Sequence, residues 1–372
     1  MTTSEGYLRP LQYKPVSKEQ DAVIAQICPG LQVIQEEKGS IADPLWGSFE
    51  SMYCGHAIDA ELRHTASSGG VLSALLVHLI EIGAVDAVLQ VAGDPDLAFG
   101  NRTVISQTRQ DILNCAGSRY APSSPLAGLN AFLASDRKYA FVGKPCDVAA
   151  LNALKREDDR VSTTFPFLLS FFCAGVPSLD GAREVLSELN VDEADLAAFR
   201  YRGNGWPGHT VASLEGGGHK QMTYAESWGG ILSRHVQFRC KICPDGTGGA
   251  ADVACADAWE TDEKGYPVFE ERNGISLVVG RTRKGEALIQ EATAAGRIAL
   301  EEFDRKQLIK IQPGQTQKRR YTLSRLLALY LLFRPRPRYR GFHLLWNAKQ
   351  AGVWANLRNF LGTLRRISRG RY

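Results

Sequence analysis

The fold is decided by the stretch at residues 139–155, YAFVGKPCDVAALNALK. Its first four residues are apolar and predict a buried strand. A turn follows at Gly143-Lys144-Pro145, and residues 148–155 have the periodicity of a helix. A strand that passes through a short turn directly into a helix is the building unit of an open α/β sheet.

Strands and helices are also predicted to alternate before and after this stretch. Upstream, apolar positions at helical spacing predict a helix over 71–82, and a strand follows at 87–91. Downstream, a buried strand is expected at 165–172 and a helix at 179–189. The alternation predicts the α/β class: an open, mostly parallel sheet with helices on both faces.

Composition and breaker residues divide the chain into four parts. Pro10, Pro15, Pro29 and Gly30 predict an irregular segment over 1–45. We expect a core in two parts, an N-terminal part over 46–135 and a C-terminal part over 136–310, and a basic, helical tail over 311–372. A smaller α+β insertion is expected around a CxxC pair in the second part of the core.

The composition is that of a globular protein. Of 372 residues, 44% are hydrophobic and 23% charged, which excludes a disordered chain, a collagen-like chain and a small disulfide scaffold. No apolar run approaches the roughly 20 residues that span a bilayer, and the first 25 residues lack the apolar stretch of a secretory signal. We therefore expect a cytoplasmic protein whose cysteines stay reduced.

Charge is distributed unevenly along the chain. After Asp304 there are 17 Lys and Arg and no Asp or Glu, whereas residues 1–304 carry 27 basic and 40 acidic residues. Residues 353–367 place apolar side chains on one helical stripe with arginines around it, as in helices that lie in a membrane interface. Two interpretations stay open: residues 320–372 meet an anionic membrane surface, at the inner membrane face, or they pack on the body or on a second copy in a homo-oligomer. Nucleic acid is disfavoured as a partner because no known binding motif accompanies the charge.

Four of the eight cysteines have a spacing that suits a metal. Cys146 and Cys173 each follow the carboxyl end of a predicted strand, where ligands bind in open α/β sheets. Cys240 and Cys243 form a CxxC pair, whose spacing lets both thiolates face one metal. Together they suffice for a 4Fe-4S cluster or a tetrahedral zinc. The alternative is that Cys146 and Cys173 are small buried hydrophobes, and we expect a structural role for the remaining cysteines, Cys28, Cys54, Cys115 and Cys255.

Small-residue turns predict contacts to an anionic cofactor. Ser67-Ser68-Gly69-Gly70 precedes the predicted helix, so its free N–H groups could approach a nucleotide pyrophosphate, although a simple helix cap explains the same residues. Gly117-Ser118-Arg119 has a similar shape with a cation added, and Lys144 lies at the same edge of the predicted sheet. Neither a Ser-His-Asp set nor a carboxylate pair stands out, so the sequence singles out no catalytic residue.

Several motifs occur together in one order: SSGG before a helix, VGKPCDVAAL, FFCAG, YRGNGWPG, and CKICPD followed by Ala251-Asp252-Val253. In this order the chain resembles the beta subunit family of the factor-420 (deazaflavin coenzyme) hydrogenases and dehydrogenases. Plant 7-hydroxymethyl chlorophyll a reductase and a cyanobacterial divinyl chlorophyllide 8-vinyl reductase are similar to this family too. The resemblance covers roughly residues 50–305 and leaves the basic tail outside.

The resemblance implies FAD and one 4Fe-4S cluster. A second cluster, carried by a ferredoxin-like module in many members, is not expected because only Cys28 and Cys54 occur before residue 100. Carried over by position, the cluster ligands are Cys146, Cys173, Cys240 and Cys243. The residues beside the flavin are Ser67, Ser68, Gly69, Gly70, Gly117, Ser118, Arg119 and Lys144.

The resemblance implies an oxidoreductase that passes electrons between a ferredoxin-like donor, or the deazaflavin coenzyme, and an organic acceptor. Asn204 and Trp206 of the glycine-rich loop are candidates to shape the acceptor pocket, or they serve loop packing. A subunit that depends on a hydrogenase-type redox partner is a related hypothesis. The alternative from another class is a non-enzymatic, zinc-stabilised module that docks on a membrane or on a polysaccharide-biosynthesis assembly.

Overall fold

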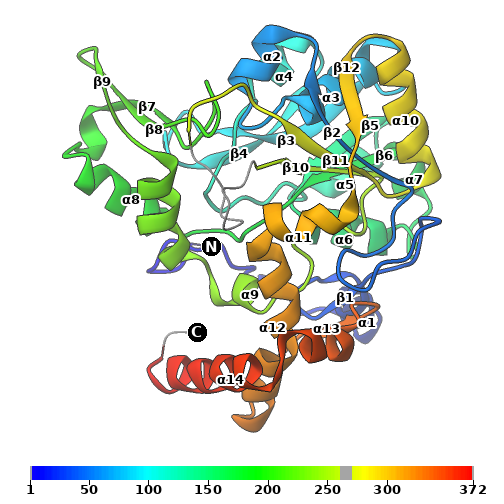
Figure 1. Cartoon of the computed structure of the whole chain (residues 1–372), viewed down its shortest axis with the longest axis vertical. Helices are drawn as coiled ribbons and strands as arrows, with labels where there is room; N and C mark the ends of the chain where they lie inside the picture. The colour runs from blue at the N-terminus through cyan, green and yellow to red at the C-terminus, as the bar shows by residue number, and fades with distance from the viewer. Residues whose placement is uncertain (1, 260–269, 371–372) are drawn as a thin grey trace.

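A central eight-stranded sheet organises the protein (Figure 1). The computed structural model of the chain describes residues 2–259 and 270–370. In their order across the sheet, the strands are β12 (Ile298–Glu302), β2 (Ser51–Ala57), β11 (Ser276–Gly280), β10 (Val253–Asp257), β6 (Phe167–Phe171), β5 (Tyr139–Gly143), β3 (Ala87–Gly93) and β4 (Asn101–Ser106).

The centre of this sheet is parallel. β10, β6, β5 and β3 pair in parallel, and β5 and β6 hold Phe141 opposite Leu168. Antiparallel strands extend the sheet on both sides: β4 beside β3, and β11, β2 and β12 beside β10. The predicted α/β class with parallel central strands is confirmed, and the β5–turn–α6 unit at residues 139–154 lies in the middle of the sheet.

Helices cover both faces of the sheet. On one face, α3 (Val71–Glu81) and α10 (Arg283–Ala294) pack on alternate sheet residues such as Ala140 and Val142. On the other face, α5 (Leu129–Leu133), α6 (Pro145–Leu154) and α7 (Arg160–Thr164) pack on Tyr139 and Phe141. Successive residues of β5 therefore point into two different cores, which explains why the strand is apolar throughout.

A smaller sheet lies beside the central one. It comprises β7 (Leu196–Arg200), β8 (Thr210–Leu214) and β9 (His219–Met222), and β8 and β9 pair as an antiparallel hairpin. It shares a separate hydrophobic core with α8 (Leu179–Glu188) and two short helical turns, η2 (Ala225–Ile231) and η3 (Leu232–His235). The chain then enters α9 (Phe238–Lys241), which carries the first cysteine of the CxxC pair.

The two expected parts of the core are joined in one sheet. β3 from the first part pairs with β5 from the second, and β2 pairs with β11. The other elements of the core are α2 (Ala60–Thr65), α4 (Arg109–Asn114), η1 (Glu193–Asp195), η4 (Arg305–Gln307) and α11 (Leu308–Ile311).

The N-terminal segment is more regular than its breaker residues predict. α1 (Lys18–Ile27) begins with a capping box, in which Ser17 and Gln20 bind each other's backbone N–H groups. A short strand, β1 (Gln32–Ile34), pairs with β13 (Arg338–Arg340) of the C-terminal tail. The expectation of an irregular segment was therefore wrong for these residues, because capping and a distant strand partner outweigh the nearby prolines.

The C-terminal tail is helical, as predicted. It consists of α12 (Pro313–Leu331), α13 (Leu344–Ala351) and α14 (Val353–Ser368), and α12 packs against both of the others. Figure 1 places α13 and α14 at one end of the long axis, away from the central sheet. Among the described residues, no helix is both long enough and apolar enough to cross a bilayer.

Candidate functional site

A cavity of about 310 Å³ opens where the parallel strands end. Its walls come from the turns that follow β5 and β6, from the end of β10 and from the turn that precedes α3. This is the edge of an open α/β sheet at which ligands bind. The predicted site residues that line it are Ser67, Ser68, Gly70, Gly117, Ser118, Arg119, Lys144 and Cys173.

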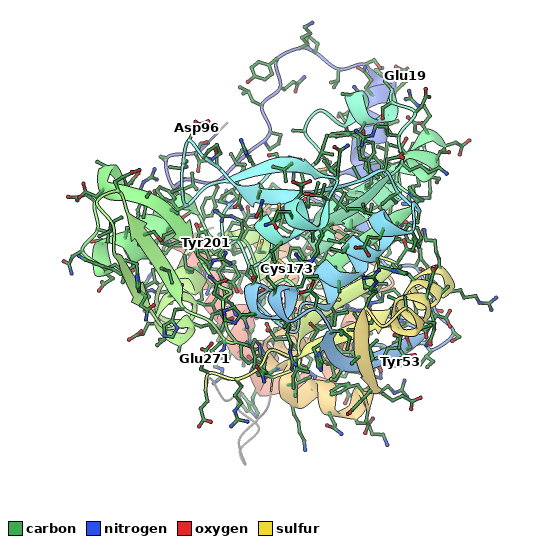
Figure 2. All side chains as sticks on the ribbon, turned by 90° about the horizontal axis from the view of Figure 1, so that it is seen from above. Glu19, Tyr53, Asp96, Cys173, Tyr201 and Glu271 are labelled. Atoms are coloured by element: carbon green, nitrogen blue, oxygen red, sulfur yellow. The ribbon has the colours of Figure 1, made fainter. Side chains whose placement is uncertain are left out.

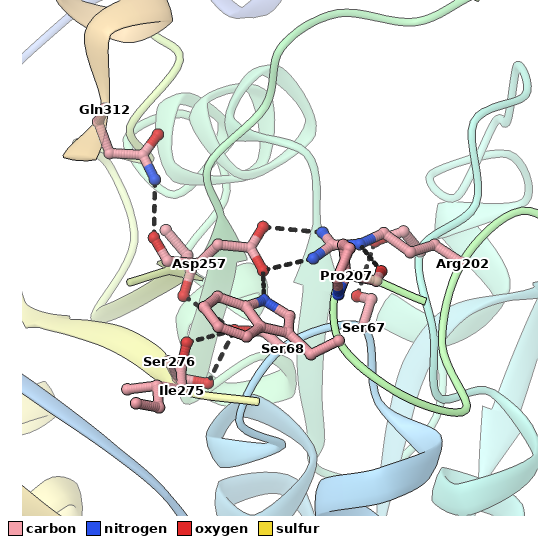
Figure 3. Close-up of polar contacts among 11 residues, drawn as sticks. Ser67, Ser68, Arg202, Pro207, Asp257, Ile275, Ser276 and Gln312 are labelled. Carbon is pink, nitrogen blue, oxygen red and sulfur yellow. Dashed lines mark hydrogen bonds and ion pairs between the residues drawn. The ribbon is translucent and has the colours of Figure 1, made fainter. Parts of the chain in front are cut away.

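The serine–glycine turn is held rigidly at this cavity. The Ser68 hydroxyl lies 3.0 Å from the Ile275 carbonyl oxygen and 3.2 Å from that of Ala256, so it ties the turn to β10 and β11 (Figure 3). Ser67 accepts a hydrogen bond of 2.7 Å from Ser118. Gly70 has φ 75° and precedes α3 without a side-chain cap, so the first N–H groups of this helix have no side-chain acceptor from the capping position.

Gly69 serves packing rather than the cavity wall. A Cβ at this position would lie 2.5 Å from the Ser276 nitrogen and 2.6 Å from the Gly55 oxygen. The turn therefore requires glycine in order to approach β2 and β11. Gly69 is the one predicted member of this turn that does not line the cavity.

Arg119 supplies a buried cation. Its guanidinium donates to Asn101 Oδ1 at 2.6 Å and to the Gly100 carbonyl at 2.8 Å, and it lies over the Tyr201 ring at 5.6 Å. Burial lowers the pKa of Arg119. These contacts fix the guanidinium at the wall without a carboxylate partner among them, so its positive charge is available to an anion in the cavity.

Lys144 supplies a second cation, but a carboxylate accompanies it. Its ammonium lies 2.6 Å from Asp147 and donates to Ser123 Oγ at 2.9 Å. Burial lowers the pKa of Lys144, but the Asp147 carboxylate and the nearby thiols of Cys146 and Cys173 together raise it above its usual value. Lys144 therefore remains protonated at the base of the cavity.

An ion pair that sequence reasoning did not identify forms a further wall. The Asp257 carboxylate accepts hydrogen bonds of 2.8 Å and 2.7 Å from Arg202 and one of 2.8 Å from Trp206 Nε1 (Figure 3). Arg202 lies over the rings of Tyr224 and Trp259, at 4.8 Å and 5.0 Å. Burial lowers the pKa of Arg202, but the Asp257 carboxylate more than offsets burial and raises it. Two signals were present in the sequence: Arg202 belongs to the YRGNGWPG loop, and Asp257 ends a strand.

The two predicted loop residues lie outside the cavity lining. Asn204 is exposed and has φ 56°. Trp206 is buried and contacts two residues of the cavity wall: it stacks on Trp259 at 4.9 Å and donates to Asp257 at 2.8 Å. In this structure Trp206 therefore positions these wall residues.

The four predicted cluster cysteines are brought together from three elements. Cys146 lies in the first turn of α6, Cys173 follows β6, Cys240 lies in α9 and Cys243 follows it. Burial raises the pKa of Cys146, and the neighbouring charges of Cys173 and Cys240 raise it further. Burial likewise raises the pKa of Cys173, to about 11, and the nearby thiols of Cys240 and Cys243 contribute to the increase. Figure 2 places Cys173 near the middle of the molecule.

The donor set around these thiols suits an anionic cluster. Four buried thiols would cost free energy as thiolates unless cations neutralise them, and Lys318 lowers the pKa of Cys173. Arg319 is fully buried, and among the described residues neither of its Nη atoms has a hydrogen-bond partner. The buried hydroxyl of Tyr339 lacks a hydrogen-bond partner among these residues too. Across residues 2–259 and 270–370, however, no three Cys, His, Asp or Glu side chains converge as a preformed metal site. In their type, their number and the charges around them, the four cysteines fit a 4Fe-4S cluster.

Some of the residues around the thiols and the cavity come from the C-terminal tail. Gln315 and Lys318 of α12 both donate to the Cys173 carbonyl oxygen, at 3.1 Å and 3.0 Å. Gln312, which precedes α12, donates to the Asp257 carbonyl at 2.8 Å. The start of the basic segment is therefore part of the site.

Of the other four cysteines, Cys115 and Cys255 also line the cavity, whereas Cys28 and Cys54 do not. Cys255 is buried within β10, and burial raises its pKa to about 12. Burial raises the pKa of Cys54, in β2, also to about 12, and Cys115 Sγ lies 3.9 Å from Ser106 Oγ. Cys28 follows α1. Their structural role stays a prediction.

Known proteins match most of the chain. Residues 52–130 match the N-terminal part, and residues 136–306 the C-terminal part, of the family described as "Coenzyme F420 hydrogenase/dehydrogenase, beta subunit". The coenzyme F420 hydrogenase subunit beta of Methanococcus voltae is 25% identical over 288 residues, which cover 72% of this chain and 88% of that protein. The F420-dependent formate dehydrogenase 1 subunit beta of Methanococcus maripaludis is 23% identical over 248 residues. These residues cover 66% of this chain and 60% of that protein.

A solved structure has the same fold. A chain of the F420-reducing [NiFe] hydrogenase complex from Methanosarcina barkeri superimposes with a TM-score of 0.57 at 23% identity, over 76% of this chain and 96% of that one. The family match ends at residue 306, so the helical tail lies beyond it. On the two family matches, which span both parts of the core in the predicted order, the chain belongs to the coenzyme F420 hydrogenase/dehydrogenase beta subunit family.

Proposed function

We propose that this chain is an oxidoreductase that passes electrons between a ferredoxin-like donor, or coenzyme F420, and an organic acceptor. Its relatives carry the names of F420 hydrogenase and F420-dependent formate dehydrogenase subunits. One observation carries the proposal: Cys173 both lines the cavity and neighbours the other three thiols. A cluster at the thiols and a cofactor in the cavity would therefore be adjacent.

In this proposal FAD occupies the cavity and one 4Fe-4S cluster is held by Cys146, Cys173, Cys240 and Cys243. The flavin supplies exchange between one-electron and two-electron chemistry, and the cluster supplies single electrons. The side chains named at the cavity wall have distinct tasks. Arg119 and the uncapped start of α3 would bind the cofactor's phosphates, because both present N–H donors to an anion.

Arg202 and Asp257 would shape the wall where the acceptor enters. The pair holds Tyr224 and Trp259 beside the cavity through ring contacts with the guanidinium. Lys318 and Gln315 would fix the backbone of Cys173 and so orient its thiol. Like its relatives in hydrogenase complexes, the protein would exchange electrons with a hydrogenase-type redox partner.

The test is an absorption spectrum of the anaerobically purified protein, with iron, zinc and flavin assayed on the same sample. Flavin bands over a broad iron–sulfur shoulder would support the proposal. A colourless protein with one zinc per chain and no flavin would overturn it in favour of the zinc-stabilised module, for which the same four thiols suffice.

Replacing Arg119 by methionine is expected to weaken FAD binding about tenfold to a hundredfold, because a charge-assisted hydrogen bond contributes roughly 1.5–3 kcal/mol. The measurement is a flavin-fluorescence titration of the apoprotein. Arg137→Met is the matched control, since Arg137 also lies over a tyrosine ring, Tyr139, but does not line the cavity. Equal FAD affinities for the two variants would contradict the assignment of Arg119.

A further inference from the structure

We propose that α12, α13 and α14 form a docking surface for an anionic lipid bilayer, on which the protein lies peripherally. The inference stands apart from the proposed function, because it concerns exposed side chains from Tyr330 onward and not the residues of α12 that contact Cys173. It depends on three observations: exposed apolar side chains on these helices, the arrangement of basic side chains beside them, and the opposite charge of the rest of the chain.

The two faces of α14 differ sharply in exposure. Thr363 and Ile367 are buried, and Ile367 packs with Leu329 of α12 and with Ile242. Trp354, on the side of the helix opposite Thr363, is 82% exposed, and Val353 in the first turn is 81% exposed. α14 is therefore attached to the body by one stripe and leaves a second, apolar stripe uncovered.

The uncovered stripe of α14 has the arrangement of an interfacial helix. At about 100° of rotation per residue, Val353, Leu357, Leu361 and Trp354 fall within a sector of about 100°. Arg365 and Arg358, both exposed, fall at the edge of this sector. Apolar and aromatic side chains bordered by arginines match the acyl boundary and the phosphate layer of a bilayer.

Other parts of the tail also expose apolar side chains. Phe333, just after α12, is 95% exposed, and Tyr330 and Leu331 in its last turn are exposed too. On α13, Leu345 and Trp346 are exposed. Together these side chains exceed the scattered single hydrophobics that are usual on a protein surface, and tryptophan and tyrosine suit the headgroup region.

The charge distribution of the chain favours anionic lipid headgroups over a neutral partner. It also determines how the protein would be oriented on a bilayer. Residues 305–372 carry 17 Lys and Arg and no Asp or Glu, whereas residues 1–304 carry 40 acidic and 27 basic residues. An anionic surface would attract the tail and repel the body. Because α13 and α14 lie at one end of the long axis (Figure 1), the protein would approach the bilayer end-on, with the central sheet away from it.

The experiment uses the full chain with its cofactors and two kinds of vesicle, phosphatidylcholine alone and phosphatidylcholine with 30% phosphatidylglycerol. Cosedimentation is expected with the anionic vesicles, and to fall as salt is added. Trp354→Ser with Leu357→Ser, and separately Arg358→Glu with Arg365→Glu, are each expected to weaken binding at least tenfold. All four side chains are exposed, so folding should be retained.

The matched controls are Tyr13→Ser with Ile58→Ser, and Arg102→Glu, which change exposed side chains of the body. They are expected to bind vesicles as the parent does. Equal binding of the tail and control variants, or no binding to anionic vesicles, would overturn the proposal. So would a dimer in light scattering that Trp354→Ser dissociates, because a second copy would then cover the surface. Flavin and iron contents of the tail variants should stay at the parent's values, which separates this proposal from the proposed function.

Discussion

Replacing Cys240 and Cys243 together by serine is expected to remove the iron from the purified protein. Both side chains neighbour Cys173, Cys240 also neighbours Cys146, and a hydroxyl is a far weaker ligand for iron than a thiolate. With two of four ligands lost, the cluster should not survive purification. The measurement is iron per chain and the broad absorbance of the cluster under anaerobic conditions.

The control for this variant is Cys28→Ala with Cys54→Ala, because both cysteines are partly buried, neither belongs to the four neighbouring thiols and neither lines the cavity. The control should keep its iron. Flavin content provides a second readout: the cavity residues of the serine variant are intact except near Cys173, so FAD should largely remain. Undiminished iron in the Cys240 and Cys243 variant would contradict the ligand assignment.

The sequence predicted the parts of this fold that local patterns determine. The helix expected at 71–82 is α3, and the strands expected at 87–91 and 139–142 are β3 and β5. Each of these segments is apolar on the face or faces that it buries, so its periodicity reports its environment directly. The antiparallel margins of the sheet were not predictable in this way, since the direction of a strand depends on connections rather than on its own residues.

The features of the site also fall into two groups, those that local sequence patterns predict and those that only tertiary packing determines. That Cys146 and Cys173 would lie near each other followed from the rule that parallel strands end at one edge of a sheet. The partner of Arg202 did not follow, because Asp257 lies 55 residues away and only tertiary packing brings the two together. The contribution of Gln315 and Lys318 was missed for a related reason: a basic segment was interpreted by its net charge, whereas the fold directs the start of α12 toward Cys173.

Replacing Asp257 by alanine is expected to lower the free energy of unfolding by about 3–5 kcal/mol, because it leaves the Arg202 guanidinium buried and uncompensated. Arg202 is 2% exposed and receives both of its carboxylate contacts from Asp257, and Trp206 loses its acceptor in the same variant. The measurement is urea unfolding of the chain. Arg160→Ala, which breaks the exposed pair with Asp158, should change the same free energy by less than about 1 kcal/mol.

A double variant separates the cost of an unpaired charge from the loss of an interaction. When Arg202→Met is added to Asp257→Ala, no charge is left buried, so part of the lost stability should return. If instead the two losses add, the pair contributes as two independent contacts and the electrostatic explanation fails. Because the Asp257 carboxylate also lies in the cavity wall beside Trp259, the single variant should in addition alter the visible spectrum of bound flavin, a change that a purely structural ion pair remote from the cavity would not produce.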